Sequence, residues 1–126
     1  MRNAGVQVKY SNLIVWNKAM DLVIGIYRIT ATFPRDELFG LTSQARRAAV
    51  SIPSNIAEGH GRKSSGAYLN HISIALGSLM ELETQIQIAF RLNFIGANET
   101  DELLAQSDEV GKMLSSLKKS ISSQTE

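Results

Sequence analysis

The chain contains no cysteine, which excludes a disulfide framework and thiolate-ligated metal sites. This lack fits a reducing compartment, so we expect a cytoplasmic protein. Long hydrophobic runs are also missing, because the longest ones, such as 22–27, are far too short to span a bilayer. The first residues lead into no apolar signal core. We therefore expect no association with a membrane.

A strong excess of either charge is lacking as well, since 13 Lys and Arg residues are balanced by 12 Asp and Glu residues. The formal net charge of +1 does not by itself indicate a nucleic-acid-binding protein. Hydrophobic residues make up 44% of the chain and charged residues 20%, a balance typical of folded rather than disordered proteins. A chain of 126 residues is the size of one domain that can bury its own core.

Helical periodicity runs through most of the chain, and no segment shows the alternation typical of a strand. The first helix ends before Pro34, because proline cannot continue a helix. Gly59 is expected to cap the end of the second helix, and Ser64 or Ser65 the start of the third. The four helices are predicted over about 13–33, 37–58, 65–93 and 99–122, the last capped by Asn98 or Thr100.

Four helices with short connections predict an all-α fold, an antiparallel up-down-up-down four-helix bundle. The bundle is expected to span 13–122, between an N-terminal arm at 1–12 and a C-terminal tail at 123–126. Its core residues follow heptad spacing in the last helix and a similar apolar line in the third. They are Leu103, Ser107, Val110, Leu114, Leu117 and Ile121 in the last helix, and Ile72, Leu76, Leu79, Leu82, Ile86 and Phe90 in the third.

The first helix carries more apolar surface than a bundle needs. Apart from Thr30, its non-apolar positions gather in one arc of roughly 100° around the helix. Trp16 and other apolar residues occupy the rest, and large exposed apolar surfaces are usually interfaces. We interpret this surplus as part of a subunit interface. The alternative is a broad core face with a few exposed aliphatic side chains.

Two lines of small and polar residues predict a close contact between the second and third helices. The lines are Gln44, Arg47, Ser51, Asn55 and Glu58 in the second helix, and Asn70, Ser73, Gly77, Glu81 and Thr84 in the third. We expect hydrogen bonds across this contact, together with an ion pair of Arg46 or Arg47 with Glu81 or Glu83. Such a pair specifies helix register more than it adds stability. A polar ligand site is the alternative interpretation.

Pro53 lies in the middle of the second predicted helix, and two interpretations are open. The proline kinks a continuous helix and frees the carbonyl of Ala49. Alternatively, a new helical segment starts here, with Ser51 or Ile52 as its cap. Either way, we expect a structural role rather than a functional hinge.

No residues form a convincing catalytic or metal site. Carboxylate-bridged metal bundles use Glu-x-x-His pairs, and neither His60 nor His71 follows a Glu by three positions. Glu81 and Glu83 point to different sides of a helix, so they do not form an acid/base pair. We therefore expect no enzyme, no metal and no cofactor, and we interpret His71 as a surface or hydrogen-bonding residue.

The loop at 59–66 is basic and rich in glycine, and it leads into a helix N-terminus, which suits an anion. It lacks the spacing of a phosphate-binding P-loop, and no strand precedes it. A flexible connection between two helices is the alternative.

Folding the chain into this bundle separates its charges between the two ends. The end that combines 1–20, 50–75 and 112–126 has eight basic and two acidic side chains, a net of +6. The opposite end has five basic and ten acidic side chains, a net of −5. Basic faces bind polyanions, so this end predicts a nucleic-acid site. Its candidate residues are Lys9, Arg62, Lys63, Lys112, Lys118 and Lys119. The alternative is that these charges only complement helix dipoles.

The segment 44–59, QARRAAVSIPSNIAEG, followed by Arg62, resembles the four-helix bundle family known from intervening sequences in bacterial 23S ribosomal RNA genes. The resemblance continues in 74–85, IALGSLMELETQ, in Trp16 and at 33–34, and it covers most of 13–121. The residues that match the family pattern are Arg46, Arg47, Ser51, Asn55, Glu58, Gly77 and Glu81. We interpret them, with Trp16, as fold and assembly residues.

The resemblance implies a small bundle that forms ring-shaped homopentamers and has no enzymatic activity. A relative is the accessory variability protein of diversity-generating retroelements, which works with a reverse transcriptase and binds nucleic acid through a basic surface. This chain differs in being nearly neutral, which confines any such binding to its basic end. We expect a non-enzymatic, oligomeric module that binds or scaffolds nucleic acid, with structured RNA as the leading ligand. The alternative is a structural or protein-interaction adaptor without affinity for RNA or DNA.

Overall fold

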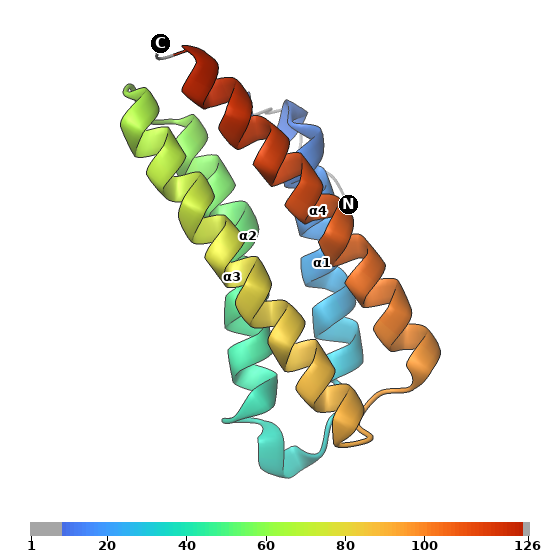
Figure 1. Cartoon of the computed structure of the whole chain (residues 1–126). Coiled ribbons are helices and arrows are strands. Elements are labelled where there is room, and N and C mark those ends of the chain that lie inside the picture. Colours follow the sequence, from blue (N-terminus) through green and yellow to red (C-terminus); the bar gives the residue numbers. More distant parts are fainter. Residues whose placement is uncertain (1–8, 125–126) are drawn as a thin grey trace.

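The computed structural model describes residues 9–124 as four long α-helices and two short 3-10 turns (Figure 1). In chain order these are η1 (Lys9–Asn12), α1 (Ile14–Thr30), η2 (Arg35–Glu37), α2 (Leu41–His60), α3 (Ser65–Arg91) and α4 (Ala97–Gln124). Successive helices run in opposite directions, and contacts join α1 to α2, α2 to α3, α3 to α4 and α4 to α1. The predicted all-α four-helix bundle is confirmed. Residues 1–8 and 125–126 lie outside the described residues, so the predicted arm and tail stay predictions.

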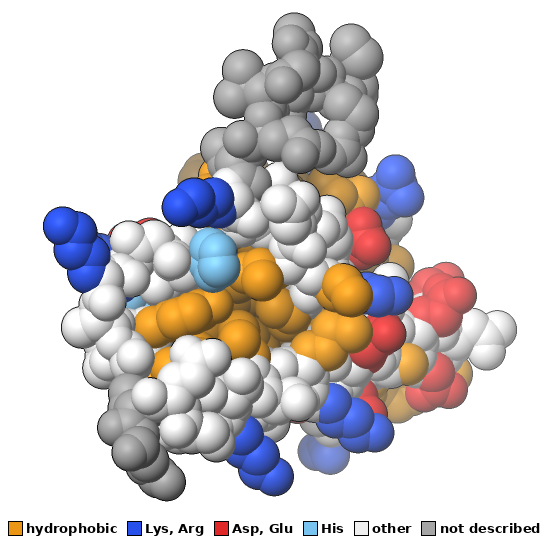
Figure 2. Space-filling model, turned by 90° about the horizontal axis from the view of Figure 1, so that it is seen from above, with side chains coloured by type: hydrophobic (Ala, Val, Ile, Leu, Met, Phe, Trp, Pro, Cys, Tyr) orange, Lys and Arg blue, Asp and Glu red, His pale blue; other side chains and the backbone are white. Residues whose placement is uncertain are grey.

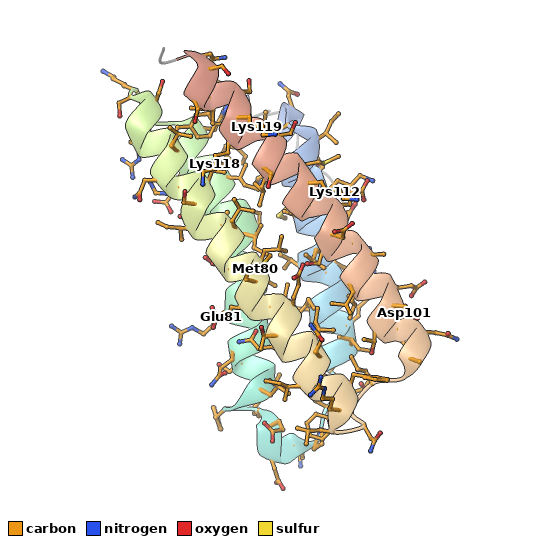
Figure 3. All side chains as sticks on the ribbon, in the orientation of Figure 1. Met80, Glu81, Asp101, Lys112, Lys118 and Lys119 are labelled. Atoms are coloured by element: carbon orange, nitrogen blue, oxygen red, sulfur yellow. The ribbon has the colours of Figure 1, made fainter. Side chains whose placement is uncertain are left out.

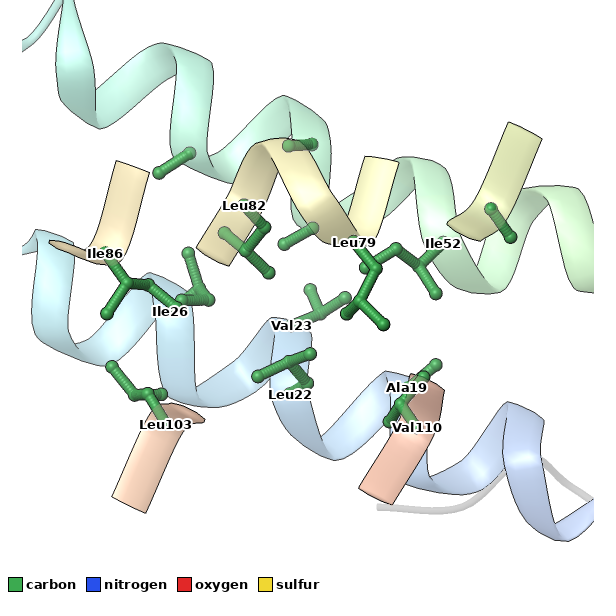
Figure 4. Packing of buried hydrophobic residues seen from close by; sticks show 14 of the residues in the cluster. Ala19, Leu22, Val23, Ile26, Ile52, Leu79, Leu82, Ile86, Leu103 and Val110 are labelled. Carbon is green, nitrogen blue, oxygen red and sulfur yellow. The ribbon is translucent and has the colours of Figure 1, made fainter. Parts of the chain in front are cut away.

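All four helices contribute to one hydrophobic core (Figure 4). Ile26, Ile52, Leu79 and Leu114, one from each helix, are at most 1% exposed. Burial of each such side chain stabilises the fold by about 1.5–3 kcal/mol relative to exposure. The predicted core residues of α4 are buried apart from the half-buried Leu117. The prediction for α3 holds for Ile72, Leu79, Leu82 and Ile86, which are buried, and Leu76 is half-buried. It is wrong for Phe90, which is 41% exposed.

The connection between α1 and α2 differs from the predicted boundaries. Helix α1 ends at Thr30, whose hydroxyl donates back to the Ile26 carbonyl (2.6 Å). Helix α2 begins at Leu41 rather than near 37, because the residues before it form η2. The Glu37 carboxylate accepts a hydrogen bond from the Leu41 amide (3.0 Å) and satisfies one of the unpaired amides at this helix start.

Helix α3 begins after the predicted cap and ends before a residue in the left-handed conformation. The Ser64 hydroxyl accepts a hydrogen bond from the Ala67 amide (3.1 Å), as predicted. At the other end Asn93 has φ 63°, and the Phe94 amide donates to the Ala89 carbonyl (2.9 Å). This pattern satisfies the last carbonyls of the helix. The predicted caps of α4 are wrong, because that helix already begins at Ala97.

Two predictions about α2 are decided by its continuity from Leu41 to His60. Gly59 lies inside the helix and is not its cap. A Cβ at Gly59 would lie only 2.8 Å from the Cβ of His71 and 2.9 Å from Tyr68 Cδ1, so glycine is needed because α3 passes very close. Pro53 also lies inside this one helix, which excludes the start of a new segment there. Nearby, the side-chain amide of Asn55 donates to the Ser51 carbonyl (2.9 Å).

Candidate nucleic-acid interface

The bundle brings the predicted basic residues to the end where α2 stops, α3 starts and α4 stops (Figure 1). Lys9 lies in η1, Arg62 and Lys63 lie between α2 and α3, and Lys118 and Lys119 lie near the end of α4. Lys112 lies on the same helix, about 9 Å before Lys118 at 1.5 Å per residue. All six are exposed or half-buried at the surface. The view onto this end shows basic side chains at separate positions around the rim, with hydrophobic side chains between them (Figure 2).

Three acidic side chains neutralise part of this basic end. Arg62 Nη2 lies 3.7 Å from a Glu58 carboxylate oxygen, and Lys112 Nζ lies 3.1 Å from Asp108 Oδ2. The third pair joins Lys18 of α1 to Glu109 of α4 at 3.4 Å. The two acids of α4 belong to the half of the chain that sequence alone assigned to the opposite end. Because these exposed pairs are weak, they reduce the local charge without fixing the side chains.

Within residues 9–124, Lys9, Lys63, Lys118 and Lys119 form no ion pair. Lys118 and Lys119 line a groove of about 510 Å³ between α3 and α4 (Figure 3). Its remaining lining residues are Leu76, Ser115, Ser122 and Ser123. Two ammonium groups and several hydroxyls offer many hydrogen-bond donors, and within residues 9–124 no carboxylate lines this groove, which suits phosphate oxygens.

The same groove continues past Leu76, Ser115 and Lys119 into a second part of about 480 Å³. This inner part also holds Lys112, but the carboxylates of Glu83 and Asp108 line it too. Glu83 accepts a hydrogen bond from the buried Ser107 hydroxyl, which ties α3 to α4. Two acidic groups repel an anion here, so only the outer part, beside Lys118 and Lys119, is electrostatically suited to a polyanion.

The predicted polar contact between α2 and α3 forms, but the α3 residues that take part differ from those predicted. The Ser51 and Ser78 hydroxyls are 2.8 Å apart, and Asn55 Oδ1 lies 2.9 Å from His71 Nδ1. Since an amide oxygen can only accept, His71 donates this bond. The predicted hydrogen-bonding role of His71 is confirmed. Its line, His71, Ser78 and Gln85, faces α2, whereas the predicted line with Gly77 and Glu81 is exposed.

The predicted ion pair between an α2 arginine and an α3 glutamate is not formed by Arg46. Its Nε donates to the Thr30 hydroxyl (2.8 Å), and its guanidinium lies 4.6 Å from the centre of the Tyr27 ring. Arg46 therefore ties α2 to α1. Arg47 and Glu81 are both exposed, and no ion pair among the described residues includes either of them. The Glu81 carboxylate instead accepts a hydrogen bond from the Gln85 side-chain amide, at 3.3 Å.

The contacts of two buried polar residues, Ser107 and Gln85, are not predicted by the sequence. Ser107 was expected in the core and bonds to Glu83, which the heptad spacing alone does not reveal. Gln85 is 5% exposed, and its Oε1 has no partner among the described atoms. Its spacing of seven from Ser78 and fourteen from His71 is the signal that places it at the α2 contact.

Tyr68 lies beside Gly59, where α3 passes close to α2. Its hydroxyl is 3.2 Å from His60 Nδ1, and the two rings pack edge to face at 5.8 Å. Burial raises the pKa of the Tyr68 hydroxyl above its usual value.

Within residues 9–124, no three His, Asp or Glu side chains are grouped so that they could hold a metal ion. None of the helices described is both long and apolar enough to cross a membrane.

Comparison with known proteins places this fold in a family. Residues 11–116 match the family described as 23S rRNA-intervening sequence protein. The structure is similar to that of a protein of unknown function from the S23 ribosomal protein family of Bacteroides thetaiotaomicron, with a TM-score of 0.76. The two are 25% identical, and the similarity covers 84% of this chain and 99% of the other. None of the curated proteins matches the chain. The chain belongs to the 23S rRNA-intervening sequence protein family.

Proposed function

We propose that this protein is a non-enzymatic, oligomeric scaffold that binds structured RNA through its basic end. The observation that carries the proposal is the outer part of the α3/α4 groove, where Lys118 and Lys119 lie beside serine hydroxyls and, among the residues that the structure describes, no carboxylate. Lys9 and Lys63 extend positive charge around the same end. Arg62 and Lys112 add to it in part, because Glu58 and Asp108 neutralise them. A cytoplasmic setting, expected from the absence of cysteine, is part of the proposal.

The chemistry of the groove favours a folded RNA over a single strand. Proteins that bind single strands stack the bases on aromatic side chains. Among the described residues that line both parts of the groove there is no aromatic ring, and around the lysines the groove offers serine and aliphatic residues. Lysines and hydroxyls instead contact the phosphates and 2′-hydroxyls of a duplex or of a compact RNA fold. DNA offers the same phosphates without the 2′-hydroxyls, so competition by duplex DNA tests that preference.

Fluorescence anisotropy of a labelled, structured ribosomal RNA fragment tests the binding, at low and at moderate salt. We expect submicromolar affinity that falls steeply with salt, because bound phosphates release counterions. Lys118→Glu with Lys119→Glu should abolish binding if the groove is the site, and Arg62→Glu with Lys63→Glu tests the loop. Arg28→Glu with Arg35→Glu is the control, since it makes the same change of charge near the opposite end. Absence of binding even at low salt contradicts the proposal.

The second part of the proposal is self-association, with a homopentamer as the expected assembly. Exposed apolar side chains support association, among them Ile24 at 46% and Tyr27 at 43% on α1. The number five comes from the family resemblance alone. Light scattering at micromolar concentration tests it, and a mass of one chain, 13.8 kDa, would contradict it.

An adaptor for protein partners, without affinity for RNA, is the second candidate. The observation that favours it is the neutralisation of Arg62, Lys112 and Lys18 by nearby carboxylates. In that case the charges at this end complement helix dipoles and assist solubility. The anisotropy experiment separates the two candidates. A substrate screen and a metal analysis of the purified protein test the non-enzymatic part of the proposal.

A further inference from the structure

The outermost line of α3 is unusual for a helix in contact with water. On the side away from the core, seven residues at the surface follow one another at helical spacing. They are Asn70, Ser73, Ile74, Gly77, Glu81, Thr84 and Ile88, and we refer to them as the α3 ridge. Glu81 is its only charged residue, while Ile74 and Ile88 are each 43% exposed. A solvated helix face carries charges instead, so the ridge has the composition of a contact surface.

Gly77, at the centre of the ridge, has no neighbour within residues 9–124 that would explain a glycine there. Gly25, Gly59 and Gly111 lie inside their helices where a neighbouring helix is close, with nearest atoms 2.8–3.3 Å from an added Cβ. A Cβ at Gly77 would have nothing within 4 Å. Glycine in a helix interior costs about 0.5–1 kcal/mol relative to alanine, so an exposed one without a neighbour lowers stability. A helix that approaches from outside the chain would give Gly77 the same role as the other three.

A hollow that could receive the ridge lies on another side of the bundle, between α1 and α2. It has a volume of about 310 Å³ and is lined mainly by apolar side chains. The lining residues are Tyr10, Trp16, Met20, Val23, Val50, Pro53, Ser54 and Ala57. Arg47 precedes Val50 and Ser54 by three and seven residues, so it lies next to the hollow on the same face of α2. Its side chain reaches the surface and forms no ion pair within residues 9–124.

The two surfaces carry complementary charges at the same height of the bundle. The hydrogen bonds from Ser51 to Ser78 and from Asn55 to His71 fix the register of α2 against α3. Both helices rise 1.5 Å per residue, so Arg47 lies level with Glu81 and Ser54 lies level with Ile74. Copies related by rotation about an axis along the bundle keep every residue at its own height. Glu81 of one copy then meets Arg47 of the next without any sliding.

We propose that the α3 ridge of one copy docks against the α1/α2 hollow of a second copy, with Glu81 paired to Arg47 across the interface. Ile74 then lies against the apolar lining near Ser54, and Gly77 permits the close approach. The contact uses a different surface on each copy, and because the paired residues lie at equal heights, repeating it involves rotation without a shift along the axis, which is the condition for a closed ring. This inference rests on the proposed self-association and not on RNA binding, and it leaves the outer part of the α3/α4 groove uncovered.

Charge reversal tests the pairing in the full chain, with mass measured by light scattering at micromolar concentration. Arg47→Glu and Glu81→Arg each place like charges together, and we expect each to weaken association on the order of 100-fold. An equal mixture of the two variants should recover most of the assembly, because opposite charges face each other wherever the two kinds of chain alternate. The double variant should assemble as the natural chain does. If assembly recovers in the double variant but not in the mixture, the two residues pair within one chain and not between copies, which overturns the proposal.

A steric variant provides an independent test. Gly77→Leu fits the single chain, because the space around Gly77 is open, yet it blocks a closely packed neighbour. We expect loss of assembly with an unchanged circular dichroism spectrum. Ala105→Leu is the control, because it places the same side chain on an exposed position of α4. Assembly of the Gly77→Leu protein at the natural mass, or a single-chain mass for the natural protein, overturns the proposal. RNA anisotropy on the same samples shows separately whether the proposed binding function holds.

Discussion

The outer faces of α3 and α4 differ sharply, although the helices are neighbours of nearly equal length, 27 and 28 residues. The α3 ridge has one charged residue. The corresponding exposed line of α4 has four, and it comprises Asp101, Ala105, Asp108, Lys112, Ser116, Lys119 and Ser123. On α4 the charges interact with each other, as the contact of Lys112 with Asp108 shows. On the α3 ridge the single charge, Glu81, has no oppositely charged partner among the described residues.

Exposure in a single chain therefore does not identify the final environment of a surface. A face that remains in water gains solubility from mixed charges, and α4 follows this rule. When a face packs against protein, each unpaired charge that is buried destabilises the contact, so such faces are depleted in charge. We therefore assign α4 and its groove to the solvent side, where a ligand can reach it, and α3 to the interface between copies.

The largest expected effect comes from charging the α3 ridge. Ile74→Asp with Ile88→Asp should reduce association more than about 100-fold, because two carboxylates would have to be buried without partners. The monomer should stay folded, since both side chains are already 43% exposed. Light scattering measures the mass, and Ala105→Asp with Ser116→Asp, both on the exposed line of α4, serves as the matched control. If the doubly charged ridge assembles like the natural chain, α3 faces water just as α4 does.

The fold could be predicted from the sequence because the core follows simple periodicity. The heptad spacing in α4 and the apolar line from Ile72 to Ile86 in α3 are properties of single helices. Helix ends were less accurate, because turns compete with helix at the boundaries. Residues 35–37 form η2, for example, since the Glu37 side chain can cap α2 from there.

Contacts between helices could not be predicted with the same accuracy, because they depend on how each helix is rotated. The His71 line and the Gly77 line of α3 are separated by roughly 90° on the helix, and both are small and polar. Only the combined packing of the core turns the first line toward α2. The role of Gly59 depends on the same rotation, since α3 must pass close to it. The candidate basic residues were predicted by topology, but their neutralising partners on α4 were not.

The next largest effect concerns the charges of α4. Lys118→Ala with Lys119→Ala should lower RNA affinity at least about tenfold and reduce the slope of log affinity against log salt by about 2, one for each lost phosphate contact. Arg28→Ala with Arg35→Ala, which removes two positive charges near the opposite end, is the matched control and should leave the slope unchanged. Anisotropy titrations at several salt concentrations measure both. An unchanged slope in the lysine variant would move the site away from this groove.

A smaller effect, on stability, distinguishes Gly77 on the outer side of α3 from Gly59 of α2, which faces the inner side of α3. In the Arg47→Glu background, which keeps the copies apart, Gly77→Ala should raise the free energy of unfolding by about 0.5–1 kcal/mol through helix propensity. Gly59→Ala should lower it by about 1–3 kcal/mol, because the new Cβ would lie 2.8 Å from the Cβ of His71. Urea denaturation measures both changes. Stabilisation by both substitutions would mean that the α2/α3 contact is looser than the structure indicates.

The smallest effect is a pH dependence on the inner side of α3, at Tyr68. Burial raises the pKa of this hydroxyl, so the folded chain holds the proton more tightly than the unfolded chain. The resulting stability is present below the ordinary tyrosine pKa of about 10 and is lost as the pH rises through the folded value. Tyr68→Phe should therefore unfold with a weaker pH dependence between about pH 9 and 11, measured by urea denaturation. Lysines titrate in the same range in both proteins, so only the difference between the two curves reports on Tyr68. Equal curves would mean that the hydroxyl reaches water freely and that α3 packs no more closely on its inner side than on its ridge.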